Sequence, residues 1–129
     1  MPVISSRPLT GTQVLVVEDE FFIAYDIAQS IEEAGGRVAG PVATLEQARE
    51  LLHDESLEIS GVILDMNLRD GRAEGLAREL HDRDLPVVVN TAEPLPLPFQ
   101  ATMPDIPVFS KPTLPQMLTD ALYSRMHAA

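Results

Sequence analysis

The residues Gly61-Val62-Ile63-Leu64-Asp65 give the clearest indication of the fold that we expect for this chain. These small and apolar residues run without alternation and end on a carboxylate, which is typical of a strand buried on both faces of a parallel sheet. The run Val14–Val17, followed by Glu18 and Asp19, repeats this pattern earlier in the chain. Ligand sites of open α/β sheets lie outside the carboxyl ends of the strands, so these acidic residues indicate where a functional site belongs.

Strands and helices alternate along the rest of the chain. Further strands are predicted at residues 37–40, 86–91 and 106–110, and helices at residues 21–34, 44–52, around 76–80 and at 113–125. Thr44 and Gln47 form a capping box, and Thr113 is expected to cap the last helix. The pattern predicts an α/β fold, a doubly wound parallel sheet of five strands. Residues 92–105 contain four prolines where a fourth helix belongs, so this helix is expected to be short or absent.

Composition and charge limit the classes of function that are possible for this chain. The chain has 129 residues and a formal net charge of −11 at pH 7, which argues against direct binding to nucleic acid or to an anionic membrane. It has no cysteine, which excludes disulfides and thiolate metal sites. There is no apolar run long enough to span a bilayer and no secretory signal, so a cytoplasmic protein is expected. Residues 1–11 are expected to form a flexible arm.

The predicted strand ends bring together three carboxylates, a hydroxyl group and an ammonium group: Glu18, Asp19, Asp65, Thr91 and Lys111. Carboxylates packed this closely repel one another and need a cation. Hard oxygen ligands without a nearby histidine or cysteine favour Mg²⁺. A metal, an ammonium group and a hydroxyl group that face one carboxylate form an arrangement suited to phosphoryl transfer.

In this order and spacing, Glu18-Asp19, Asp65, Thr91-Ala92 and Lys111-Pro112 resemble the motifs of receiver domains of two-component response regulators. The resemblance implies a flavodoxin-like fold with strand order 2-1-3-4-5 for residues 12–127. It also implies phosphorylation by a histidine kinase or a histidine phosphotransfer protein. No output domain is expected, so a stand-alone receiver would signal through contacts with a downstream protein that the sequence does not identify.

The resemblance also implies a role for each residue of the site. Asp65 would be the phosphoacceptor, and Thr91 and Lys111 would bind phosphoryl oxygens. Mg²⁺ would be held by Glu18, Asp19, Asp65 and the backbone carbonyl of Asn67. Thr91 and Phe109 would form the conformational switch. Asn67 and Glu93 would tune dephosphorylation, which the domain is expected to perform on itself.

The residues leave two alternatives open. The proline-rich segment 94–98, in place of a full fourth helix, favours an interaction module that has the receiver fold but works without phosphorylation. We interpret the segment itself as a stiffened linker rather than a polyproline II docking strip. A haloacid-dehalogenase-type phosphatase also uses a strand-end aspartate, a threonine and a lysine. That family needs a second aspartate two residues after its nucleophile, where this chain has Asn67.

Overall fold

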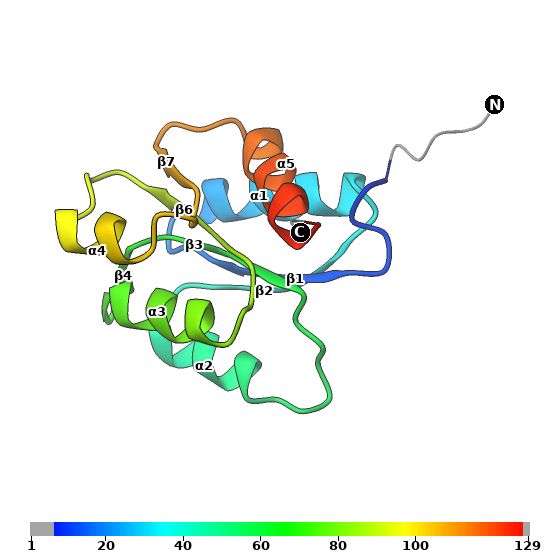
Figure 1. Cartoon of the computed structure of the whole chain (residues 1–129). Helices are drawn as coiled ribbons and strands as arrows, with labels where there is room; N and C mark the ends of the chain where they lie inside the picture. Colours follow the sequence, from blue (N-terminus) through cyan, green and yellow to red (C-terminus); the bar gives the residue numbers. More distant parts are fainter. Residues whose placement is uncertain (1–6, 128–129) are drawn as a thin grey trace.

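A parallel sheet of five strands forms the centre of the molecule (Figure 1). The structure is a computed structural model, and it describes residues 7–127. The strands of the sheet are β1 (Gln13–Val17), β2 (Arg37–Val42), β3 (Gly61–Leu64), β6 (Val87–Thr91) and β7 (Val108–Ser110). They lie in the order β2-β1-β3-β6-β7, and every neighbouring pair is parallel. This is the predicted order 2-1-3-4-5, so the doubly wound, flavodoxin-like fold is confirmed.

Helices cover both faces of the sheet (Figure 1). On one face lie α1 (Phe21–Glu33) and α5 (Pro115–Met126), and on the other lie α2 (Leu45–Leu52) and α3 (Glu74–Asp82). Successive side chains of a strand point to opposite faces, so one strand serves both layers. Val14 and Val16 pack in the layer of α1 and α5, whereas Leu15 and Val17 pack in the layer of α2 and α3. All four side chains are fully buried, as the unbroken apolar run predicts.

The fourth helix is present and short. It is α4 (Leu97–Thr102), which begins after Pro96 and has Pro98 in its first turn, where a missing backbone N–H is tolerated. Phe99 is the buried residue of this helix, and it belongs to the core cluster on the α2 and α3 side of the sheet. The prolines therefore shorten this helix without abolishing it.

A small antiparallel hairpin, which the sequence analysis did not predict, follows the central strand. Its strands are β4 (Asn67–Leu68) and β5 (Gly71–Arg72), so Asn67 lies directly opposite Arg72. Gly71 has a φ of +146°, a conformation that favours glycine. The hairpin continues the chain from the end of β3 to the start of α3, and it borders the candidate site described below.

Two side chains cap the N-terminus of α2. The Gln47 backbone N–H donates to Thr44 Oγ1 at 3.0 Å, as the predicted capping box requires. Asp70, from the turn of the hairpin, accepts hydrogen bonds from the backbone N–H groups of Leu45 at 2.7 Å and Glu46 at 3.1 Å. Asp70 therefore anchors the hairpin to α2, and its negative charge suits the positive end of the helix dipole.

Two local predictions differ from the structure. The second strand was expected to end at Gly40, but β2 continues through Pro41 to Val42. It is an edge strand, where a proline need not remove a ladder hydrogen bond. Thr113 does not cap the last helix, because Leu114 occupies the N-cap position. The Thr113 hydroxyl lies 2.9 Å from Asn90 Oδ1 instead.

The start of the domain also differs from the prediction of a flexible arm over residues 1–11. Residues 1–6 lie outside the described part of the chain. Within residues 7–11, Leu9 is fully buried beside Ile31, and its backbone N–H donates to the Ala34 carbonyl at 2.8 Å. This segment therefore packs on the domain because Leu9 fills the layer between the sheet and α1. Among residues 7–127, no helix has both the length and the apolar character that crossing a bilayer requires.

Candidate functional site

The carboxyl ends of two neighbouring strands place three carboxylates side by side. Glu18 and Asp19 follow β1, and Asp65 follows β3. One carboxylate oxygen from each of the three residues lies within 4.8 Å of the other two. Glu18 and Asp65 are each 4% exposed, whereas Asp19 is half-buried. The acidic cluster that the sequence predicts is therefore one geometric unit at the edge of the sheet.

Lys111 reaches this acidic cluster from the connection between β7 and α5. Its Nζ lies 3.1 Å from Glu18 Oε1, 3.4 Å from Asp65 Oδ2 and 3.7 Å from Glu20 Oε1. Burial alone would lower the pKa of Lys111, but the hydrogen bond to Glu18 and the charges of the nearby carboxylates raise it above its ordinary value. Lys111 is therefore a fixed positive charge that offsets part of the negative charge of the cluster.

The carboxylate of Glu18 is incompletely compensated. Burial, reinforced by repulsion from Asp65, raises the pKa of Glu18 from 4.5 to about 7, against the opposing effects of Lys111 and the backbone N–H of Glu20. Glu18 Oε2 accepts hydrogen bonds from Lys111 Nζ and from the Glu20 backbone N–H, whereas the buried Oε1 lies at ion-pair distance from Lys111 Nζ but accepts no well-directed hydrogen bond from the described residues. This oxygen, which lacks a hydrogen bond within residues 7–127, and the carboxylates of Asp19 and Asp65 form a donor set suited to a small, hard divalent cation. Glu18, Asp19 and Asp65 are therefore able to hold a divalent metal ion.

Thr91 and Phe109, the predicted switch residues, lie on β6 and β7, the two strands that follow β3 in the order of the sheet. Thr91 ends β6 and is buried, and its Oγ1 accepts a hydrogen bond from the Glu93 backbone N–H at 3.4 Å. Its carbonyl accepts one from the Lys111 backbone N–H at 2.9 Å, which ties the end of β6 to the residue after β7. Phe109 lies on β7 opposite Asn90, half-buried against the layer of α1 and α5.

Asn67 and Glu93, the predicted tuning residues, are in direct contact. Asn67 Nδ2 donates to Glu93 Oε1 at 2.5 Å, and the Asn67 backbone N–H donates to Asp65 Oδ1 at 3.3 Å. Arg72, which the sequence analysis missed, joins them: its Nη1 donates to Asn67 Oδ1 at 2.8 Å and to Glu93 Oε1 at 3.3 Å. The Asp70-Gly71 pair could have indicated a turn here, but not the register, because the structure has Arg69 and Asp70 in the turn and thereby places Arg72 opposite Asn67.

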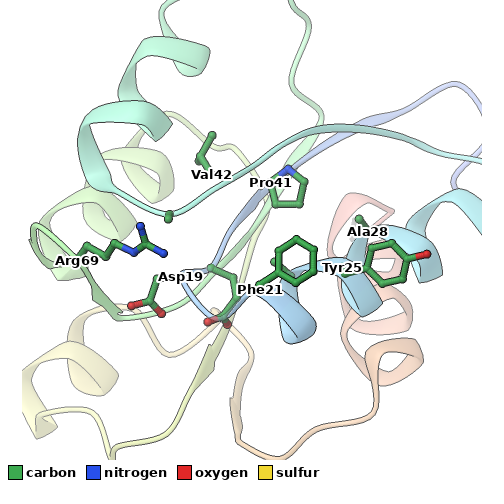
Figure 2. A pocket seen from close by; sticks show the side chains of 10 residues that line it. Asp19, Phe21, Tyr25, Ala28, Pro41, Val42 and Arg69 are labelled. Carbon is green, nitrogen blue, oxygen red and sulfur yellow. The ribbon is translucent and has the colours of Figure 1, made fainter.

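An apolar pocket of about 240 Å³ opens beside the acidic cluster, between α1 and the end of β2 (Figure 2). Asp19 and Arg69 lie at one end of it, and the rings of Phe21 and Tyr25 lie along α1. These two rings are stacked, with centroids 6.4 Å apart, and both are exposed, as is the neighbouring Phe22. An exposed aromatic surface of this kind suits contact with a partner protein.

Solved structures with the same fold are receiver domains of response regulators. A response regulator receiver protein from Sinorhizobium medicae matches with a TM-score of 0.78 and 24% identity, over 91% of this chain and 95% of that chain. A CheY-like receiver domain protein from Methanospirillum hungatei matches with a TM-score of 0.78 and 18% identity, over 89% and 93% of the two chains.

A variant of the anti-anti-sigma factor PhyR from Bartonella quintana is 28% identical, with a TM-score of 0.66, over 89% of this chain and 48% of that chain. No protein-family model matches the sequence, and no curated protein sequence matches it. The structural likeness shows that this chain has the receiver fold.

Proposed function

We propose that this chain is a response regulator receiver that accepts a phosphoryl group on Asp65 from a histidine kinase or a histidine phosphotransfer protein. The observation that carries the proposal is the buried Asp65 carboxylate at the end of β3, which contacts Lys111 and belongs to one cluster with Glu18 and Asp19. These three carboxylates would hold Mg²⁺, with the backbone carbonyl of Asn67 as a further proposed ligand. Bound Mg²⁺ would offset negative charge on the transferred phosphoryl oxygens.

The chemistry assigns a role to each residue near Asp65. A carboxylate oxygen of Asp65 forms a bond to phosphorus while the bond between phosphorus and the histidine nitrogen breaks, and the nitrogen leaves with the electron pair. Lys111 contacts the acceptor carboxylate and brings a positive charge to the oxygens of the incoming group. Thr91, at the end of the adjacent strand β6, offers a hydroxyl donor to the same oxygens.

Phosphorylation would act on the rest of the domain through Thr91 and Phe109. The phosphorylated side chain carries more negative charge and more acceptor oxygens than the carboxylate it replaces. We infer that the Thr91 hydroxyl turns toward these oxygens and vacates space for the Phe109 ring. Since Phe109 is half-buried on the neighbouring strand β7, its movement would change the outer surface of the domain.

The aromatic surface of α1 supports a protein phosphodonor. Phe21 and Tyr25 line the pocket that Glu18 and Asp19 also line, and the exposed ring of Phe22 contacts that of Phe21. The same surface also supports the second candidate, an interaction module with the receiver fold that binds its partner without phosphorylation. The two functions differ in what replacement of Asp65 does, because a phosphorylation-independent partner would bind the wild-type protein and Asp65→Ala equally well.

The mass of the intact protein after incubation with Mg²⁺ and acetyl phosphate tests the proposed function. We expect the wild-type protein to gain one phosphoryl group and Asp65→Asn to gain none. Asp120→Asn, which makes the same chemical change at an exposed position of α5, should be labelled like the wild type. Equal labelling of Asp65→Asn would overturn the assignment of the acceptor. An unlabelled wild-type protein would count against the receiver chemistry and favour the interaction module.

A further inference from the structure

Arg72 is a charged residue beside the candidate site that has no role in the function proposed above. Its guanidinium group has partners on two sides. Nη1 donates to Asn67 and Glu93, while Nε and Nη2 donate to Glu74 Oε2 at 3.1 Å and 2.5 Å. Because all three nitrogens of the planar group have partners, the orientation of the guanidinium is fixed.

Arg72 closes a ring of hydrogen bonds in which Asn67, Glu93 and Arg72 each contact the other two. The ring connects two strand ends of the site. Asn67 follows the end of β3 and donates its backbone N–H to Asp65, and Glu93 follows the end of β6 and donates its backbone N–H to Thr91. The ring therefore borders the acceptor carboxylate from the side of the loop between β6 and α4.

The hairpin gives Arg72 a fixed base from which to hold Glu93. Asp70 binds the N-terminus of α2, Leu68 is buried, and the Ala73 backbone N–H donates to the Met66 carbonyl at 3.0 Å. Glu93, in contrast, lies in the loop before α4, and its side chain is 61% exposed. Arg72 is therefore the anchored partner of the pair, and Glu93 is the partner that is held.

The charges around the site indicate how the ion pair of Arg72 and Glu93 could affect the rate of phosphorylation. Lys111 offsets part of the negative charge of the acidic cluster and Glu20, whereas Arg72 shares its positive charge between Glu93 and Glu74. Phosphodonors are anions, so an unpaired and mobile Glu93 beside Asp65 would repel them. We propose that Arg72 is a positioning residue that holds Glu93 and offsets part of its negative charge, and that it thereby sets the rate at which an anionic phosphodonor phosphorylates Asp65. This inference rests on the proposed phosphorylation of Asp65.

If Arg72 only stabilised the fold, its replacement would lower the thermal denaturation temperature, and any slower phosphorylation would follow from that loss of stability. The side chains of Arg72 and Glu93 are 46% and 61% exposed, and exposed ion pairs contribute little to the free energy of unfolding. Replacement of Arg72 should therefore leave a folded protein, with a thermal denaturation temperature close to that of the wild type. An effect on the rate of phosphorylation would then report on the site itself.

The test compares the initial rates of phosphorylation by acetyl phosphate, at saturating Mg²⁺ and low salt, in five proteins: wild type, Arg72→Gln, Glu93→Gln, the double variant and Arg83→Gln. Arg83→Gln removes the same charge from an exposed position at the far end of α3 and is the matched control. We expect Arg72→Gln to be about three- to tenfold slower than the wild type, and Arg83→Gln to be unchanged. In the Glu93→Gln background, the further change Arg72→Gln should have little effect.

The possible outcomes separate the two proposals. If the wild-type protein is phosphorylated and Arg72→Gln is as fast as Arg83→Gln, the role of Arg72 is overturned while the proposed function stands. If Arg72→Gln is slow and Glu93→Gln does not relieve the defect, Arg72 does not act through Glu93, and the inference is again wrong. If the wild-type protein is not phosphorylated at all, the proposed function fails, and the role of Arg72 fails with it.

Discussion

At the scale of a single residue, the negative charge of the Glu18 carboxylate can be neutralised either by a proton or by a bound cation. Burial of the carboxylate and repulsion from Asp65 raise the pKa of Glu18 to about 7, because the nearby Lys111 compensates the negative charge only in part. Near neutral pH, the residue can therefore exchange a proton for another positive charge at little cost. A divalent cation that binds the acidic cluster would compete with that proton, because both neutralise the same carboxylates.

The raised pKa of Glu18 predicts how the free energy of unfolding depends on pH. Glu18 holds its proton more tightly in the folded protein, with a pKa of about 7, than in the unfolded chain, where the ordinary value is 4.5. The folded protein therefore binds more protons between these values, and the free energy of unfolding falls as the pH rises through this window. We expect a loss on the order of 2 kcal/mol from about pH 5 to about pH 8 in the presence of a chelator, measured by chemical denaturation.

Two controls identify Glu18 as the source of this loss. Glu18→Gln cannot titrate, so most of the pH dependence should disappear in this variant. Added Mg²⁺ should stabilise the wild-type protein more at about pH 8 than at about pH 5, since fewer protons compete with it at the higher pH. A wild-type protein whose stability rises with pH across this window would contradict the assignment.

The positions of most site residues follow from the sequence because each stands at the end of an apolar strand. The strand order then brings Glu18, Asp19, Asp65 and Lys111 together, as the structure shows. Arg72 could not be found in this way. Its place depends on a two-residue turn that folds the chain back on Asn67, and its partner Glu93 lies 21 residues further along the chain.

The same distinction between local and distant partners applies to whole elements. The cap of α2 was predictable because Thr44 and Gln47 are three residues apart and the bond needs nothing else. The cap of α5 was predicted wrongly because the Thr113 hydroxyl lies against Asn90, 23 residues away, and the helix begins after Leu114 instead. Local chemistry decides an element's end only where no tertiary contact competes for the same side chain.

The short helix α4 provides a prediction at this scale. It has six residues and no side-chain cap, so we expect its place on the domain to depend on the burial of Phe99. Phe99→Ala should lower the free energy of unfolding by about 3 kcal/mol, because it leaves a cavity in the core. Leu97→Ala, in the same helix at a position that is 79% exposed, should change it by less than about 0.5 kcal/mol.

Chemical denaturation of both variants, with the wild type beside them, measures this difference. Equal and small effects of the two substitutions would mean that the helix is held by its backbone contacts rather than by Phe99. Phe99→Ala should also leave labelling by acetyl phosphate largely intact wherever the protein is folded, since Phe99 belongs to the core and not to the acidic cluster.

At the scale of the whole molecule, the net charge of −11 opposes the approach of an anionic phosphodonor. Raising sodium chloride from about 0.02 M to about 0.5 M shortens the screening length several-fold and should speed labelling by acetyl phosphate about two- to fivefold at saturating Mg²⁺. Phosphoramidate carries less negative charge and should gain less from salt. Arg72→Gln, with Glu93 unpaired, should gain more than the wild-type protein. If salt slows labelling by acetyl phosphate, Lys111 and the bound cation attract the donor more strongly than the whole protein repels it, and the argument from net charge is wrong.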